Sequence, residues 1–496
     1  MPSHHRRILP ALTTLALAGA AFAGVPAGTD PLVPERLMFR VTDAARLAAF
    51  VAAAQQQFSN VAVVDQIPNR PIYMLRYTLA AGQDAGAAET FCAQQTQAGN
   101  ALWAELNYEG QSAEGKTDSF WLSQFGIGPD LFADQYAFPL IGLPQAHQRS
   151  LGQRVLIAVL DTGVDGSHPA FGGTVRGDGV SFVATGATGA GDAGDGADDD
   201  GDGLVDEQVG HGTFVAGLTH AVAPQATILP IAVLNSDGVG DLFGIAKGMA
   251  HAIDAGADVI NMSLGSTYSS VLLSDMVREA DDSGAVVVGA MGNFARENPE
   301  EFPASMTGVV GVCATDESDH LAGFSNWNPK AKLSAPGTTA MAGPGVDPAR
   351  ALVGPVPGGG WAAWKGTSFS TALVSGAAAL VRAQHPTWPD AQVDRAHIAR
   401  EILAALEDGS VDIDALNPGF HGLIGAGRLH AGATTLLAPP APRLGDIDGD
   451  GTVGGADIGA LLGDFGAACG AGCAGDLNRD GRVDGADIGL LLGNWG

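Results

Sequence analysis

Ser368 is a candidate nucleophile because it lies at the start of a predicted helix. It follows Gly366 and Thr367 and opens a run of small apolar residues that continues to His385-Pro386. The run predicts a helix that ends there, because proline cannot continue the hydrogen-bond ladder. A serine at a helix N-terminus lies among unpaired N–H groups, which would stabilise the oxyanion formed when serine attacks a carbonyl. Taken alone, the same serine is better explained as a helix N-cap, and only the residues upstream favour the nucleophile.

Three further polar residues supply the partners that such a serine needs. Asp161 closes the apolar segment 154–160, which predicts a buried strand. His211 opens a second helix of small residues, and Asn293 follows the apolar strand 285–288. A carboxylate, an imidazole and a hydroxyl form a base-activated nucleophile, and an amide can bind the oxyanion.

In this chain order the four motifs resemble the subtilisin-like serine protease (subtilase) family, over roughly residues 135–435. The resemblance implies that Ser368 is the nucleophile, that His211 is the general base and that Asp161 orients the imidazole. It implies that the Asn293 side chain joins the Ser368 N–H in the oxyanion hole. It also implies an α/β fold with a doubly wound, mostly parallel sheet, and the alternation of strand-like and helix-like runs favours the same architecture.

Two segments resemble the walls of the family's substrate cleft. Ser263, Leu264 and Gly265 are expected to offer backbone groups to an extended peptide. Ala290, Met291 and Gly292 are expected to form a second wall, where Met291 would narrow the pocket for large side chains.

The chain departs from the family pattern next to its catalytic residues. Phe214 replaces the second histidine after the catalytic one, and Phe369 replaces the methionine after the serine. Ala372 replaces a proline shortly downstream. These changes bear on the turnover rate and leave the expected type of reaction unchanged.

Composition and charge bound the remaining functions. Apolar residues make up 46% and charged residues 16% of the 496 residues, which suits globular domains. The net charge of −29 argues against a nucleic-acid partner, since phosphate binding needs a basic surface.

A basic start, an apolar stretch and Ala21-Phe22-Ala23 predict a secretory signal peptide at 1–23, whereas the stretch is too short for a membrane span. We therefore expect a secreted protein, either free or attached to a cell surface, with no membrane span.

The region before the catalytic motifs predicts a small domain at 24–109. Its expected order, β-α-β-β-α-β, is ferredoxin-like. It is similar to subtilase propeptides, which inhibit the enzyme and assist its folding; a generic small α/β domain is the alternative. The expected elements are strands at 36–41, 61–67, 72–79 and 102–107, with helices at 43–58 and 84–98.

A Gly/Ser/Asp-rich segment at 110–134 reads as a linker that contains the maturation cut. The catalytic domain is expected at 135–437. Within it, the acidic segment 198–207 spaces carboxylates at every second residue with a glycine after the third, as a calcium loop does. A solvated acidic loop is the alternative. The expected ligands are Asp198, Asp200, Asp202, the Leu204 carbonyl, and Asp206 or Glu207.

A proline-rich linker at 438–444 precedes a duplicated motif at 445–496, whose copies are offset by 30 residues (476 − 446). Each copy follows the spacing of an EF-hand loop and has one apolar helix after it. The arrangement resembles the type I dockerin module, and the resemblance implies calcium at two sites. The ligands of the first are Asp446, Asp448, Asp450, Thr452 and Asp457, and those of the second are Asp476, Asn478, Asp480, Arg482, Asp484 and Asp487.

Dockerins bind cohesin modules, so a cohesin-like or cell-surface partner is one expectation for this C-terminal module. A calcium-stapled tail that only stabilises or tethers the protein is the other. For the whole chain, we expect a calcium-dependent serine endopeptidase that acts on polypeptides, made as a zymogen with its own propeptide as inhibitor. The rival is a catalytically silent subtilase fold used for binding or assembly.

Overall fold

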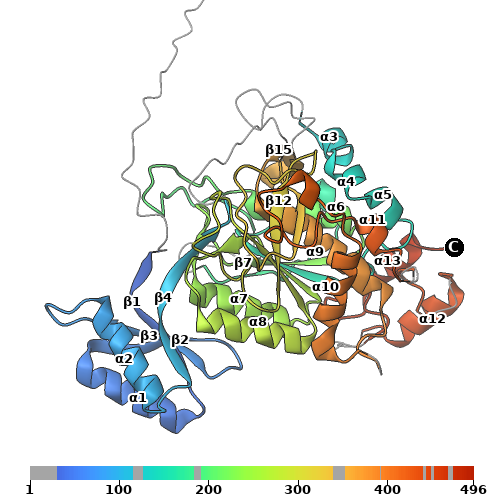
Figure 1. Ribbon diagram of the computed structural model, residues 1–496. Coiled ribbons are helices and arrows are strands. Elements are labelled where there is room, and N and C mark those ends of the chain that lie inside the picture. The colour runs from blue at the N-terminus through green and yellow to red at the C-terminus, as the bar shows by residue number, and fades with distance from the viewer. Residues whose placement is uncertain are drawn as a thin grey trace, which may run out of the picture.

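The computed structural model describes most of the chain after residue 30 (Figure 1). The predicted signal peptide lies outside the described residues, as do the predicted calcium ligands Asp448 and Asp450. The described ranges are 31–114, 127–183, 191–338, 352–390, 393–438, 443–447, 452–466 and 473–496.

Seven parallel strands form the central sheet, in the order β13-β12-β11-β9-β5-β7-β6. Most of their residues are buried and apolar, as expected for a parallel sheet covered on both faces. The predicted parallel α/β sheet is confirmed. Its strands are β5 (Leu156–Asp161), β6 (Val180–Ser181), β7 (Thr227–Ala232), β9 (Val259–Met262), β11 (Val286–Ala290), β12 (Val309–Thr315) and β13 (Leu333–Pro336).

Helices cover both faces of this sheet. On one face, α6 (His211–Val222) and α9 (Thr367–Gln384) share a hydrophobic core with Ile157 and Val159 of β5. On the other, α7 (Leu242–Asp254) and α8 (Val271–Ser283) pack with the alternate β5 residues Leu156, Ala158 and Leu160. The period of two along β5 thus divides its side chains between two cores.

Small residues let α6 and α9 approach closely. A Cβ added at Gly376 of α9 would lie 2.5 Å from the Cβ of Val222 in α6. Both helices begin near the carboxyl edge of the sheet, the place where active groups gather in open α/β folds. The small-residue pattern seen in the sequence therefore serves to bring the starts of these two helices together.

Shorter elements complete the central body. A hairpin of β14 (Leu352–Val356) and β15 (Gly360–Trp364) packs over α6. The remaining helices are α3 (Pro129–Ala133), α4 (Ala137–Leu140), α5 (Leu143–Ala146), α10 (Ile398–Asp408) and α11 (Ala431–Thr434), with 3-10 turns at Pro169–Phe171, Pro357–Gly359, Arg395–His397 and Asp414–Leu416.

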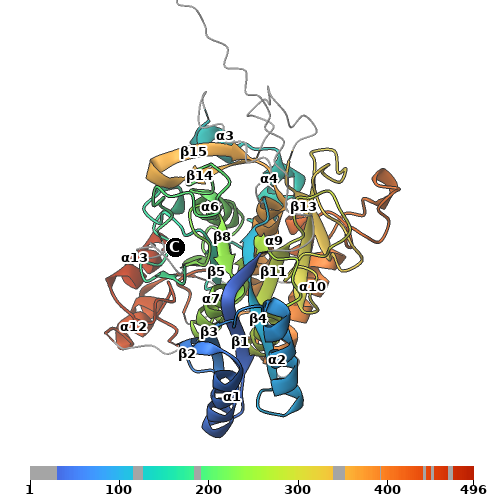
Figure 2. The same ribbon diagram turned by 90° about the vertical axis from the view of Figure 1, so that its left-hand side faces the viewer.

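The N-terminal unit forms an antiparallel sheet in the order β4-β1-β3-β2, with two helices in the predicted β-α-β-β-α-β sequence order. Figures 1 and 2 show it projecting from the α7 and α8 side of the central body. Its elements are β1 (Leu32–Arg40), α1 (Ala44–Gln57), β2 (Ser59–Gln66), β3 (Ile72–Thr78), α2 (Ala85–Gln97) and β4 (Trp103–Ser112).

The strand predicted to end at Asn107 is longer than expected, since β4 continues to Ser112. Its last residues leave the N-terminal sheet and pair with β8 (Val239–Asp241) on one side and β10 (Leu264–Gly265) on the other. Partners from the central body therefore extend the strand, and a reading of local sequence could not foresee them.

Polar contacts fix the N-terminal unit on the central body. The Glu105 carboxylate accepts hydrogen bonds from Ser270 Oγ at 2.7 Å and from the Leu272 N–H at 2.9 Å, so it caps the start of α8. Arg40 forms an ion pair with Asp275 at 2.8 Å, and Lys247 pairs with Asp65 at 2.9 Å.

The C-terminal unit contains two short helices, α12 (Gly455–Gly463) and α13 (Gly485–Gly493), which pack through Leu461 and Leu491. It lies against the central body in both views of the ribbon (Figures 1 and 2). Arg479 makes the main polar contact, because its guanidinium pairs with Asp258 and donates to the Gly256 carbonyl at 2.8 Å.

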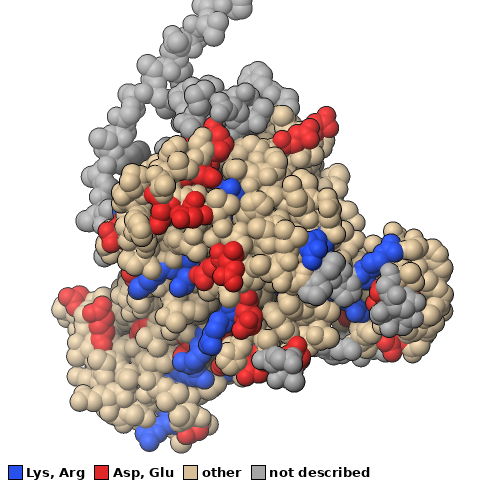
Figure 3. All heavy atoms as spheres, turned by 45° about the vertical axis from the view of Figure 1, so that its right-hand side comes forward, with Lys and Arg blue, Asp and Glu red and all other residues tan. Residues whose placement is uncertain are grey.

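The surface carries both signs of charge. On the face drawn in Figure 3, basic side chains are interspersed with acidic ones and do not form one continuous stripe. Within the described ranges, no helix is both long enough and apolar enough to cross a bilayer.

Candidate active site

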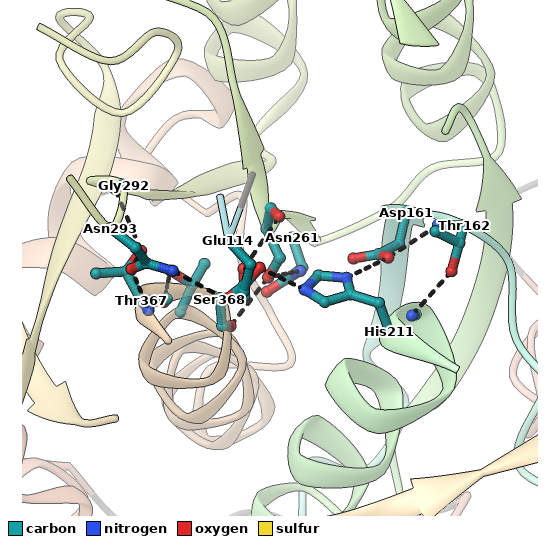
Figure 4. Close-up of polar contacts among 12 residues, drawn as sticks. Glu114, Asp161, Thr162, His211, Asn261, Gly292, Asn293, Thr367 and Ser368 are labelled. Carbon is teal, nitrogen blue, oxygen red and sulfur yellow. Dashed lines mark hydrogen bonds and ion pairs between the residues drawn. The ribbon is translucent and has the colours of Figure 1, made fainter. Parts of the chain in front are cut away.

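Asp161 and His211 meet at the carboxyl edge of the sheet. Asp161 is the last residue of β5 and His211 the first of α6, and both are completely buried. The Asp161 Oδ1 atom lies 2.6 Å from His211 Nδ1 and also accepts a hydrogen bond from the Thr162 N–H at 2.8 Å (Figure 4). This contact fixes the orientation of the imidazole and turns its Nε2 atom away from the sheet.

Ser368 lies in the first turn of α9, on the other side of Nε2. Its Oγ donates hydrogen bonds to Glu114 Oε2 at 2.7 Å and to the Ser263 carbonyl at 3.2 Å. The N-cap of α9 is Gly366, which contributes no side chain, so no side chain of the N-cap residue covers the N–H groups of the first turn. The serine hydroxyl therefore sits where a developing negative charge would be stabilised.

Asn293 is held with its amide nitrogen toward the same point. Its Oδ1 accepts hydrogen bonds from the Thr367 N–H at 2.9 Å and from Thr367 Oγ1 at 2.8 Å. Because the oxygen is engaged in this way, Nδ2 is free to point into the site, where it donates to Glu114 Oε1 at 3.2 Å. A fixed amide donor beside a serine hydroxyl has the form of an oxyanion hole.

Glu114 joins these groups, and sequence reasoning missed it. Its Oε2 atom lies 2.7 Å from His211 Nε2 and accepts the Ser368 hydrogen bond, so one carboxylate bridges base and nucleophile (Figure 4). The segment containing it reads as a polar linker, and no local signal marks a glutamate there as a site residue.

The two carboxylates change the charge state of His211. Burial by itself disfavours the imidazolium, but the charges of Asp161 and Glu114 outweigh burial and hold the pKa of His211 well above its usual value. With Glu114 in place, the two carboxylates therefore favour the protonated form of His211.

A second missed residue, Asp192, positions the start of α6. Gly210, the N-cap of this helix, brings no side chain, and the buried Asp192 carboxylate takes its place. It accepts hydrogen bonds from the Gly210 N–H at 2.9 Å, the Thr213 N–H at 3.0 Å and Thr213 Oγ1 at 2.6 Å, and one from Thr162 Oγ1 at 3.0 Å. Asp192 thus links β5 and α6, the two elements that carry Asp161 and His211.

The departures Phe214 and Phe369 pack against each other. Their ring centroids lie 4.5 Å apart, and Trp364 lies 5.6 Å from Phe369 and 5.5 Å from the imidazole of His211. The two substitutions therefore form one aromatic cluster behind the histidine. Ala372 is buried in the same hydrophobic core.

The predicted cleft walls flank the site. Leu264 and Gly265 form β10 and pair with Ser112 and Gln111 of β4, while the Ser263 carbonyl accepts from the Ala113 N–H at 3.3 Å. This wall pairs through its backbone with an extended segment of the same chain.

The second wall, Ala290 to Gly292, ends β11. The Met291 side chain is completely buried in a cluster with Cys313 and Ile424, away from the space between the walls. That space contains Glu301: Cβ atoms added at Gly265 and Gly292 would lie 3.1 Å from its Oε2 and 2.7 Å from its Cγ. Glu301 is buried and accepts a hydrogen bond from Arg296 at 2.9 Å, so it, and not Met291, limits the depth between the walls.

A cavity of about 360 Å³ opens beside Glu114 on the Asn293 side of the site. Phe324 and Lys365 form part of its lining.

The acidic loop forms two sets of carboxylates, and the oxygens within each set lie close enough together to bind one metal ion. The first comprises Asp198, Asp200 and Asp202, and the second comprises Asp200, Glu207 and Asp237, the last of which sequence reasoning missed. Burial and the neighbouring carboxylates raise the pKa of Glu207 to about 7. Its Oε2 atom is buried without a hydrogen-bond partner among the described residues. A divalent cation would satisfy this oxygen and offset the repulsion.

The other predicted ligands of this loop are placed differently. The Asp206 carboxylate accepts from the backbone N–H groups of Asp195 at 2.9 Å and Gly196 at 3.1 Å, and belongs to neither set. Leu204 lies in the same loop with an exposed side chain. Of the two alternatives for the last carboxylate, Glu207 is the one that lies with Asp200.

The described parts of the two copies of the C-terminal motif share one pattern of hydrogen bonds. Asp487 accepts from the Leu477 N–H at 2.7 Å and the Asp484 N–H at 2.8 Å. Asp457 does the same for the Ile447 and Gly454 N–H groups, at 2.6 and 2.7 Å. In the second loop, Asp476 also accepts a hydrogen bond from the Gly481 N–H, and Asp484 accepts one from the Ala486 N–H. Asp480 accepts hydrogen bonds from the Asn478 side chain and the Arg482 N–H. In the first loop, Asp446 is buried and Thr452 is exposed.

Burial and the nearby carboxylates of Asp487 and Asp480 raise the pKa of Asp476. This crowding of acids is the electrostatic condition that a bound cation would relieve.

Comparison with known proteins agrees with this geometry. A profile of the subtilase family matches residues 152–427, which are 276 of the 496 residues. Subtilisin E of Bacillus subtilis (strain 168) is 35% identical over 271 residues, which cover 52% of this chain and 63% of the relative. The thermostable alkaline protease of Halalkalibacterium halodurans is 31% identical over 310 residues, 60% of this chain and 73% of the relative.

Among solved structures, fervidolysin from Fervidobacterium pennivorans, described as a keratinolytic enzyme related to subtilisin, superposes with a TM-score of 0.61 at 21% identity. The superposition covers 84% of this chain and 64% of that one, and it establishes a shared fold.

The role of Asp192 can be tested with Asp192→Asn. An amide would turn an N–H donor toward the N–H groups that the carboxylate accepts, and His211 would lose its fixed position. We expect kcat for peptide hydrolysis, the reaction of such a constellation, to fall about tenfold or more with KM nearly unchanged. The exposed Asp282→Asn is the matched control. An unchanged kcat in a folded Asp192→Asn protein would contradict the positioning role.

Proposed function

The chain belongs to the subtilase family, and on this premise we propose that it is a serine endopeptidase that hydrolyses polypeptides. One observation carries the proposal: Ser368, the His211–Asp161 pair and the Asn293 amide converge within hydrogen-bond reach of one point. The constellation comes from four separated parts of the chain, and a structural role explains no more than one of its members.

The proposed reaction uses each group for one task. Ser368 Oγ attacks the substrate carbonyl and passes its proton to His211 Nε2, while Asp161 stabilises the imidazolium. The Asn293 Nδ2–H and the Ser368 N–H bind the oxyanion. The imidazolium then protonates the leaving amine, and water hydrolyses the acyl-enzyme by the same route in reverse.

We further propose that the N-terminal unit is a ferredoxin-like propeptide that inhibits the site. Support comes from β4, which lies along the cleft wall as an added strand, and from the ion pairs that fix the unit on α7 and α8. The proposed organisation is a signal peptide, propeptide, maturation segment, catalytic domain, linker and dockerin-like module at 1–23, 24–109, 110–134, 135–437, 438–444 and 445–496. A secreted zymogen follows from it.

Calcium is the proposed cofactor. Asp200 shared between two carboxylate sets, with the unpartnered Glu207 oxygen beside it, supports a site in the acidic loop. Asp192 lies six residues before this loop (198 − 192), so an ion there would steady the segment that leads from the residue that caps the His211 helix. The C-terminal loops supply two further candidate sites.

For the C-terminal module, the structure favours the stabilising alternative over free docking to a cohesin-like partner. Arg479 lies within the second loop, and its partner Asp258 also contacts Arg382 of α9 and the Leu156 N–H of β5. A loop engaged in this way is directed toward its own catalytic domain.

The catalytic proposal is tested by comparing the processed protein with Ser368→Ala on casein. Loss of the nucleophile should lower kcat/KM on the order of 10⁴-fold or more. The exposed Ser269→Ala serves as the control and should retain full activity. If wild type and Ser368→Ala are equally inert while both are folded, the silent-fold alternative is correct.

Glu301 between the cleft walls predicts a preference for small residues before the scissile bond. The buried Glu301 side chain, held by the partly exposed Arg296, leaves little depth for an aromatic ring. In a peptide library, we expect cleavage after Ala to exceed cleavage after Phe about tenfold or more, because the shallow space accepts a methyl group and excludes the larger ring. Efficient cleavage after Phe or Tyr would refute this.

Calcium binding at the acidic loop should appear in thermal unfolding. At about 100 times Kd, calcium should raise the Tm by roughly 5 °C, and chelation should reverse the shift. Asp237→Asn removes one ligand of the second set and should reduce the shift, whereas Asp282→Asn should leave it intact. An identical calcium response in Asp237→Asn would show that the ion binds elsewhere.

A further inference from the structure

The end of β4 runs through the proposed substrate cleft. Gln111 pairs with Val239 of β8 on one side and with Gly265 of β10 on the other. The next residue continues the pattern, because the Ser112 N–H donates to the Gly238 carbonyl at 2.8 Å. The chain thus enters the site as the middle strand of three, in the extended conformation of a bound peptide.

Two contacts bracket the peptide bond that follows. The Ala113 N–H donates to the Ser263 carbonyl at 3.3 Å, and Ser368 Oγ donates to that same oxygen at 3.2 Å. The carbonyl carbon of Ala113 is only two covalent bonds from its nitrogen. On the far side, the Glu114 carboxylate lies 2.7 Å from Ser368 Oγ. The peptide bond between Ala113 and Glu114 therefore lies beside Ser368 Oγ, the proposed nucleophile.

We propose that the Ala113–Glu114 peptide bond is the self-processing bond of this chain, and that the Glu114 side chain gates its cleavage. The proposal rests on the proposed protease function and adds the position of the cut and the group that delays it. It also agrees with the shallow space between the cleft walls, since Ala113 has a small side chain.

The gate follows from what one carboxylate engages. Glu114 Oε2 faces both His211 Nε2 and the Ser368 hydroxyl, and Oε1 takes the Nδ2–H of Asn293 (Figure 4). Base, nucleophile and oxyanion donor are therefore all bound to a side chain and not to a scissile carbonyl. His211 Nε2 is engaged by the Glu114 carboxylate at 2.7 Å, so it is not available to the Ser368 hydroxyl.

The fit around the carboxylate is close. A Cβ at Gly366 would lie 1.9 Å from Glu114 Oε1, so glycine is required there for the carboxylate to enter. Glu114 is almost completely buried, and its contacts to imidazolium, amide and hydroxyl are the charge-assisted kind that a neutral amide makes less strongly.

Cleavage requires the carboxylate to leave and His211 to release its extra proton to solvent. Ser368 Oγ then attacks the Ala113 carbonyl carbon and gives its proton to His211 Nε2. The C–N bond to Glu114 breaks, the nitrogen receives that proton, and Ala113 stays as an ester on Ser368. Water hydrolyses the ester, which leaves a carboxylate on Ala113 and a free amino group on Glu114.

The first test locates the cut. Purified precursor is followed over time by intact mass and N-terminal sequencing, at several protein concentrations, beside Ser368→Ala. We expect the first product to begin at Glu114, at a rate independent of concentration, and Ser368→Ala to stay uncut. A first product that begins elsewhere, from an enzyme that digests casein, overturns the inference alone. A precursor that neither processes itself nor digests casein overturns the proposed function with it.

The second test addresses the gate. Glu114→Gln keeps the shape of the side chain and removes its charge, so we expect the same cut about tenfold faster. The exposed Glu297→Gln is the matched control and should process at the wild-type rate. An unchanged or slower rate in folded Glu114→Gln refutes the gate. Ala113→Trp checks the register without touching the charge and should slow processing; unchanged processing refutes the assignment of the bond.

Discussion

The buried contact between Asp161 and His211 is the interaction on which the rest of the site depends. A carboxylate without solvent costs several kcal/mol unless a charge and hydrogen bonds compensate it. The compensation requires α6 to begin directly beside the end of β5. Gly212 makes this approach possible, since a Cβ there would lie 2.1 Å from the Gly163 carbonyl oxygen and 3.1 Å from the Asp161 side chain. Asp192 then holds the two elements in that position.

The same constraint explains why a third carboxylate matters. Once the imidazole is fixed by Asp161, its Nε2 can face either a serine that it activates or an acid that keeps it protonated. Glu114 supplies the acid, two residues beyond the end of β4, the strand that pairs with β10 through its backbone. The active and the latent state would then differ in whether His211 Nε2 faces the Ser368 hydroxyl or the Glu114 carboxylate, with no rearrangement of the fold between them.

The sequence sufficed to identify the groups whose chemistry and neighbours are both local. Ser368, His211 and Asp161 each stand at the junction of a recognisable strand or helix, so their convergence at one sheet edge could be predicted. Asn293 followed from the strand before it. Phe214 and Phe369 were seen as separate departures, and only the fold brings their rings together.

Residues that act across the chain could not be found in this way. Glu114, Asp192 and Asp237 are three of 54 acidic residues, and nothing in their local sequence distinguishes them. Glu301 was missed for the same reason, and Met291 was chosen in its place because it belongs to the wall segment itself. The only available signal was indirect: the helix that begins at His211 has Gly210 as its N-cap, which brings no side chain, so a carboxylate from elsewhere in the chain could take that place.

The most direct test of the account is the reaction of the processed protein with a fluorophosphonate probe, with the adduct located by peptide mass spectrometry. A serine activated by the His211–Asp161 pair should take up one phosphonyl group per chain, on Ser368 and on no other residue. Folded, processed protein that remains unlabelled, or that is labelled at another residue, would contradict the assignment of this site as a working serine nucleophile.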